Sequence, residues 1–130
     1  MQDFISDIYH RRLIDTYTEV RETFKKLGMM LSVLDRQISD IYHEIECTNE
    51  EELDAIACTV RLKAALTRRR CVKDEMARLK PFNSMAKQAL NEIEVRYEGA
   101  LRASFEIRQQ VNISMTVEEV AAEMGVEGLR

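Results

Sequence analysis

Positive charge gathers in one stretch of this chain, and this stretch comes closest to a chemical site. Between Asp54 and Asp74 the sequence holds basic residues and no acidic residue. The basic segment comprises Arg61, Lys63, Arg68, Arg69, Arg70 and Lys73. On a helix, Arg61 and Arg68 share a face because seven residues make nearly two turns. Such a segment could bind phosphate, a nucleotide, nucleic acid or an acidic protein surface.

The basic segment also has a simpler interpretation as a solvated helix face, or as a match for acidic residues of a neighbouring chain. The acidic run before it comprises Glu44, Glu46, Glu50, Glu51, Glu52 and Asp54. Arg69 falls on the apolar side of its predicted helix, where a charge is costly unless it is paired. We expect an Asp or Glu from another helix beside Arg69, or a bound anion. The candidate binding residues are the basic segment together with Glu50, Glu51 and Glu52.

The remaining reactive residues form no recognisable catalytic or metal-binding pattern. His43 and Cys47 are four residues apart and share a helix face, but zinc would need two further ligands. The sequence has no glycine-rich phosphate loop, no H-E-x-x-H and no G-x-S-x-G. Its single D-x-x-H, Asp40 to His43, is not the pair of E-x-x-H motifs of a di-iron bundle. We therefore expect no enzymatic activity, no metal and no cofactor.

The composition predicts few, long helices. One proline and four glycines in 130 residues leave little material for turns. The net charge of −4 disfavours a general nucleic-acid binder. The three cysteines contain no C-x-x-C pair, and neither a signal peptide nor an apolar run of membrane-spanning length is visible. We expect a reduced protein of the cytoplasm, without membrane association, and of the host cytoplasm if the protein is viral.

The strongest structural signal is an apolar stripe whose members alternate at intervals of four and three residues. This first seam comprises Leu13, Tyr17, Val20, Phe24, Leu27, Leu31, Leu34, Ile38, Ile41 and Ile45. The spacing predicts the contact face of a coiled coil or a long bundle helix. The stripe keeps its phase across Gly28, so we expect one continuous helix there; the alternative is a break into two helices at Gly28.

Two further long helices and a short one are predicted. Thr48 with Glu51, or Asn49 with Glu52, matches a capping box, and Pro81 is expected to end the helix that follows. A second seam comprises Ala55, Cys58, Leu62, Ala65, Arg69, Val72, Met76 and Leu79, and a third Ala86, Leu90, Ile93, Tyr97, Ala100, Ser104, Ile107 and Val111. The predicted helices are about 3–47, 49–79, 84–112 and 117–124. They form one all-α domain, 1–130, an antiparallel bundle or coiled coil of three main helices and a short C-terminal helix.

The unequal helix lengths predict self-association. A helix over 49–79 is too short to cover one over 3–47, because length scales with residue number. The first seam would stay exposed from Leu13 to Phe24, or beyond Leu34, and exposed apolar stripes mark interfaces. We expect a homo-oligomer, with a dimer favoured.

Two segments resemble parts of small, uncharacterised helical proteins from phages of Gram-positive bacteria. They are Leu34–Glu46, LDRQISDIYHEIE, and Leu66–Met76, LTRRRCVKDEM. The hexapeptide ISDIYH within the first also occurs at Ile5–His10. The resemblance implies an accessory viral protein that engages a host component, for example to blunt a defence system, and it assigns no residue a role. We predict a non-enzymatic helical interaction protein; the alternative is a binder of anions, nucleotides or nucleic acid through Arg68–Arg70.

Overall fold

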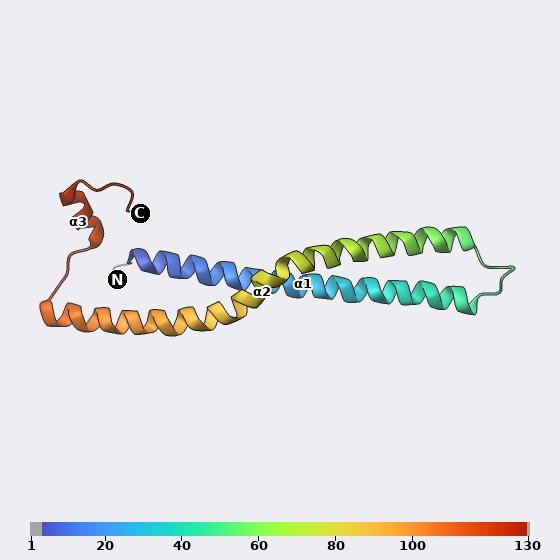
Figure 1. Cartoon of the computed structure of the whole chain (residues 1–130), viewed down its shortest axis with the longest axis horizontal. Coiled ribbons are helices and arrows are strands. Elements are labelled where there is room, and N and C mark those ends of the chain that lie inside the picture. Colours follow the sequence, from blue (N-terminus) through green and yellow to red (C-terminus); the bar gives the residue numbers. More distant parts are fainter. Residues whose placement is uncertain (1–3, 130) are drawn as a thin grey trace. The chain divides into compact units, whose positions relative to one another are not determined.

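The computed structural model describes residues 4–129, and over that range it is helical with no strand (Figure 1). The helices are α1 (Ile5–Cys47), α2 (Ala55–Val111) and α3 (Val117–Met124). The predicted all-α class is therefore confirmed. The predicted number of three main helices is wrong, because one helix occupies the range assigned to the second and third.

Contacts divide the chain into two compact units, which we describe separately. Unit 1 combines α1 up to Glu19 with the chain from Ala86 onward, and unit 2 is the segment Val20–Met85. Each unit contains a pair of antiparallel helices. In unit 2, Asp35 contacts Arg69 and Glu44 contacts Arg61. Residues later in α1 therefore pair with residues earlier in α2, so the two helices are antiparallel.

The prediction that Pro81 ends a helix is wrong. Pro81 lies inside α2, although a proline in a helix interior loses one backbone hydrogen bond and its ring crowds the carbonyl four residues earlier, here that of Ala77. The seam explains why the helix continues. Leu79, Asn83 and Ala86 follow one another at intervals of four and three and are all at least half-buried. An unbroken inward face on both sides of Pro81 favours one helix over two.

The start of α2 also differs from the prediction. The proposed capping residues Thr48 and Asn49 lie in a turn, where the Asn49 carbonyl accepts bonds from the N–H groups of Glu52 and Leu53 at 3.0 and 2.9 Å. The side chain that caps α2 is Asp54, whose Oδ1 accepts from the Ala57 N–H at 3.0 Å. The turn uses the residues that would have formed the capping box, so the helix begins at Ala55.

Helix α1 is continuous through Gly28, as predicted. At its start, the Phe4 N–H donates to Oδ2 of Asp7 at 3.0 Å, which satisfies one free backbone donor. The predicted start of this helix, at about residue 3, lies outside the described residues. Most of the first seam faces inward, but Leu13 is 45% exposed and its neighbour Ile14 takes the inner position.

The core of unit 2 is a single strip between α1 and α2. Ile38, Ile41 and Ala65 are buried in it, with Ile45 and Leu62 packed against them. Two helices cover only one stripe of each other, so the outer faces remain exposed. Because α2 has 57 residues and α1 has 43, α2 is not the short helix on which the predicted self-association depended.

Helix α3 spans 117–124, the range that its sequence predicts. Thr116 caps it by accepting a bond from the Glu119 N–H at 3.3 Å. Gly125 ends it at φ 71°, a left-handed conformation that glycine adopts without steric cost.

Candidate functional site

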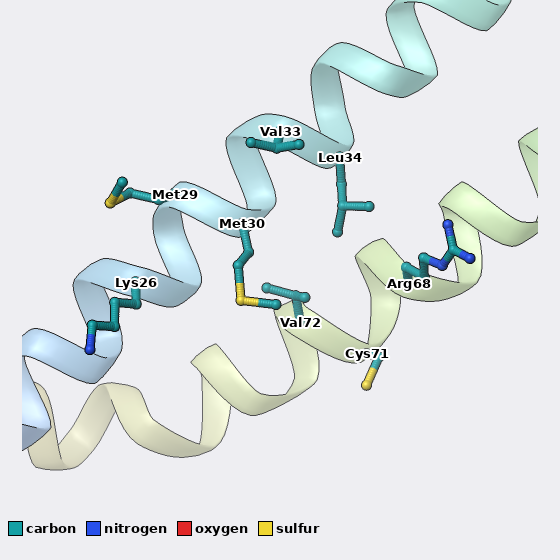
Figure 2. A pocket seen from close by; sticks show the side chains of 8 residues that line it. All are labelled: Lys26, Met29, Met30, Val33, Leu34, Arg68, Cys71 and Val72. Carbon is teal, nitrogen blue, oxygen red and sulfur yellow. The ribbon is translucent and has the colours of Figure 1, made fainter.

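An apolar groove lies between α1 and α2 in unit 2, with a volume of about 640 Å³. Figure 2 shows Met30 and Leu34 reaching from α1 towards Val72 on α2. The groove is lined by Lys26, Met29, Met30, Val33, Leu34, Arg68, Cys71 and Val72. The two helices supply these residues because their inner stripes pack together while the adjacent positions on each helix remain open.

The groove has a buried floor and an exposed apolar rim. Leu34 and Val72 form the floor, at 8% and 7% exposure. Above them Met29, Met30 and Val33 are 62%, 51% and 49% exposed. Methionine side chains are flexible and polarisable, and they recur on surfaces that adapt to protein partners. A cluster of exposed apolar side chains over an apolar floor is typical of a binding surface.

The charges at the groove have one sign. Lys26 and Arg68 are its charged lining residues, and no carboxylate lines it. An occupant that places apolar side chains on Met29, Met30 and Val33 would find cations for acidic groups at its edges. The groove therefore suits an apolar segment with flanking acidic residues.

Two members of the basic segment are held by carboxylates of α1. Arg61 Nη1 donates to Glu44 Oε2 at 2.6 Å, and this hydrogen bond raises the pKa of Arg61. Arg69 Nε donates to Asp35 Oδ1 at 2.6 Å. Arg69 thus has the kind of partner expected for a charge on the seam, an acidic residue from another helix. Arg61 finds its acidic partner, Glu44, within this chain.

The other candidate binding residues do not converge on one site. Arg68 lines the apolar groove, whereas Arg69, Arg70 and Lys73 line a separate hollow of about 460 Å³ with Leu66 and Asp74. Lys63 is exposed on α2 and lines neither.

The predicted acidic contacts lie apart from both hollows. Glu50, Glu51 and Glu52 are exposed in the turn before α2. Among residues 4–129 they share no ion pair with the basic segment. The structure therefore does not bring the candidate binding residues together: Arg61, Lys63 and Glu50–Glu52 line neither hollow.

His43 and Cys47 lie together, with Cys47 Sγ 3.7 Å from His43 Nε2 on an exposed face. Within the described part of the chain, no group of three potential metal ligands is formed. In the same part, no helix combines the length and apolar character needed to cross a membrane.

Sequence reasoning missed a polar cluster between α1 and α2 in unit 1. The Tyr97 hydroxyl donates to Asp7 Oδ1 and lies 2.9 Å from Ser6 Oγ. The His10 ring stacks on Tyr97 with centroids 4.5 Å apart, and its buried Nε2 lies 3.3 Å from Glu94 Oε1 without hydrogen-bond geometry. Extending the seam backwards from Tyr17 through Ile14 to His10 and Asp7 would have placed these side chains inward.

Hydrogen bonding and burial set the proton affinities in this cluster. The hydrogen bond from Tyr97, and then that from the Phe4 N–H, lower the pKa of Asp7. Burial, followed by the hydrogen bond to Asp7, raises the pKa of Tyr97. Both shifts favour a charged Asp7 beside a neutral Tyr97. The cluster joins the two helices of unit 1, and Tyr97 also lines a hollow of about 490 Å³ with Tyr17, Glu92 and Arg96.

Comparisons with protein-family models, with curated proteins and with solved structures found no match. The assignment of a function therefore rests on the residues and geometry described above.

Proposed function

We propose that the chain is a non-enzymatic helical interaction protein that binds another protein in the groove of unit 2. The observation that carries this proposal is the set of exposed side chains Met29, Met30 and Val33 above the buried floor of Leu34 and Val72. Complete burial of one such side chain contributes about 1.5–3 kcal/mol. Burial of three such side chains contributes a favourable binding free energy. Part of it offsets the translational and rotational entropy that the two proteins lose on association.

A helix is the natural occupant of this groove. Two adjacent helices present a hollow into which a third can lay apolar residues at positions i, i+3 or i+4, and i+7. Such an occupant would complete a three-helix packing around Leu34 and Val72, which two helices leave with one open side.

The chemistry of the lining supports binding over catalysis. The lining residues include the Cys71 thiol, and no histidine or carboxylate that could act as its general base lies among them. In the setting implied by the resemblance to phage proteins, the bound protein would be a host component, such as a defence protein that is inhibited by capture.

Anion or nucleic-acid binding through Arg68–Arg70 is the second candidate. The hollow beside Arg69, Arg70 and Lys73 supports it. We rank it lower because Asp35 pairs with Arg69, and Asp74 lines the same hollow. Titration of DNA, RNA and cyclic dinucleotides against the wild type and an Arg68/Arg69/Arg70→Ala variant tests it. Salt-sensitive binding lost in the variant would establish it, and no binding at low salt would exclude it.

The test of the main proposal compares two exposed valines. Val33 lies in the groove, whereas Val60 is exposed on α2 away from it. We expect the tagged full-length chain and its Val60→Asp variant to retain the same stoichiometric protein from a bacterial lysate, and Val33→Asp to lose it. Circular dichroism of each variant verifies the fold. Equal retention by both variants, or no retained protein, would contradict the proposal.

A further inference from the structure

His43 and Cys47 form a pair of potential zinc ligands at the end of α1. Both side chains are exposed, and Cys47 carries a free thiol. The Cys47 sulfur lies 3.7 Å from Nε2 and 3.8 Å from Nδ1 of the His43 ring. Zinc–sulfur and zinc–nitrogen bonds of about 2.3 and 2.0–2.1 Å, at the tetrahedral angle, hold the two ligand atoms about 3.6 Å apart. The pair therefore already has the spacing of one edge of a tetrahedral zinc site.

The charges around this pair favour a cation. Helix α1 ends at Cys47 without a basic residue in its last turn, so no cationic side chain of that turn offsets the negative end of the helix dipole. Glu46 and Glu50–Glu52 are exposed next to it along the chain. Among residues 4–129 these carboxylates form no ion pair, whereas Glu44 is paired with Arg61. A divalent cation at this end of α1 would therefore lie in a region of negative potential.

A single chain supplies too few ligands for a closed zinc site, which has four. The expectation of no metal rests on this shortage, and within residues 4–129 no group of three potential ligands forms. A second copy of the chain supplies the same two ligands again. A two-fold axis through the ion would bring both pairs onto it, because the two copies are identical. The resulting set of two thiolates and two imidazoles is one that tetrahedral zinc prefers.

We infer that one zinc ion joins two copies of this chain through His43 and Cys47 of each copy. The two thiolates balance the charge of the ion. Without the ion, Glu46 and Glu50–Glu52 of one copy repel those of the other, so the contact depends on the metal. The site lies outside the groove of unit 2, whose lining residues on α1 end at Leu34. The inference therefore stands apart from the proposed function.

The first experiment uses Co²⁺ in place of zinc, because tetrahedral cobalt bound by thiolates is strongly coloured. Titration of the reduced, metal-free, full-length chain should give visible bands and thiolate-to-cobalt charge-transfer absorption that saturate at one ion per two chains. Addition of Zn²⁺ should remove the colour by displacing the cobalt. Cys47→Ser or His43→Ala should abolish these bands. Cys71→Ser, which removes the other exposed thiol, should leave them unchanged.

Two results of the cobalt titration would overturn the inference. One is the absence of thiolate-to-cobalt absorption from the wild type. The other is absorption that survives Cys47→Ser, because a different thiol would then hold the metal. Circular dichroism of each variant verifies that it keeps its helices, as expected for substitutions at exposed positions.

Light scattering of the wild-type chain tests the bridge without any substitution. We expect the mass of one 15.1 kDa chain in the presence of EDTA and twice that mass with half an equivalent of zinc. Renewed addition of EDTA should restore the single chain. Cys71→Ser should behave as the wild type, and Cys47→Ser should stay a single chain with zinc. Saturation at one ion per chain without a change in mass, or a dimer that persists in EDTA, would overturn the inference.

Discussion

Arg69 on α2 donates a hydrogen bond from Nε to Oδ1 of Asp35 on α1 at 2.6 Å. The arginine interrupts the apolar seam of α2 between Ala65 and Val72, both of which are buried. Its carboxylate partner allows a charge at this position, and a shift of either helix by one residue would separate the pair. The contact therefore contributes to the register of α1 and α2 in unit 2.

We predict a measurable energetic coupling between Asp35 and Arg69. Both side chains are partly exposed, so the coupling should be about 0.5–1 kcal/mol, the upper range for accessible ion pairs. Urea unfolding of Asp35→Asn, Arg69→Ala and the double variant measures it as a double-mutant cycle. Additive losses from the two single substitutions would contradict a role for this pair.

Substitution of Pro81 by alanine should stabilise the chain. Pro81 is exposed within α2, and alanine restores the backbone donor and removes the clash with the Ala77 carbonyl. We expect the free energy of unfolding to rise by about 1–3 kcal/mol. Urea denaturation with Lys80→Ala as the neighbouring control measures the change. A loss of stability would mean that the proline conformation is required by the fold.

The first turn of α2 should depend on Asp54. Removal of its side chain in Asp54→Ala leaves the Ala57 N–H without its acceptor, at a cost of about 1 kcal/mol. Thr48→Ala, which alters a residue of the predicted capping box, should change the stability by much less. Thermal unfolding followed by circular dichroism compares the two. Equal losses would indicate that Thr48 also stabilises the helix start.

The polar cluster of unit 1 should make stability depend on pH at both extremes. Asp7 has a folded pKa below its reference of 3.8, so its contribution is present above 3.8 and is lost as the pH falls towards the folded pKa. Tyr97 has a folded pKa above 10.0, so its contribution is present below 10.0 and is lost as the pH rises towards the folded pKa.

Chemical denaturation across these pH ranges, with two variants, checks this prediction. Asp7→Asn should weaken the acid dependence, and Tyr97→Phe should weaken the alkaline dependence. Unchanged pH profiles in both variants would show that other groups determine them.

The helical class was predictable because the apolar spacing of α1 requires no tertiary information. The predicted helix end at Pro81 came from a rule about local backbone geometry. The inward-facing positions that continue through Asn83 outweighed this rule, and the helix does not end at Pro81. At Gly28 we predicted a continuous helix because the apolar spacing keeps its phase there. The same criterion applied at Pro81 would have predicted a continuous helix as well.

The site was less predictable, since it depends on two helices at once. An acidic partner for Arg69 followed from its place on the seam, but its identity as Asp35 required the register. The groove was not apparent because Met29, Met30 and Val33 lie outside the first seam. It exists only where α2 brings Cys71 and Val72 beside them. The cluster of His10 and Tyr97 similarly needed the pairing of distant segments.

The most direct test of the central claim, that the groove of unit 2 binds a protein, is site-specific photo-crosslinking. The full-length chain carries p-benzoylphenylalanine in place of Val33 or, as the control, Val60, and it is irradiated in a bacterial lysate. The proposed binding surface predicts a discrete one-to-one protein adduct at position 33, identified by mass spectrometry, and none at position 60. No adduct at position 33, or equal adducts at both positions, would contradict it.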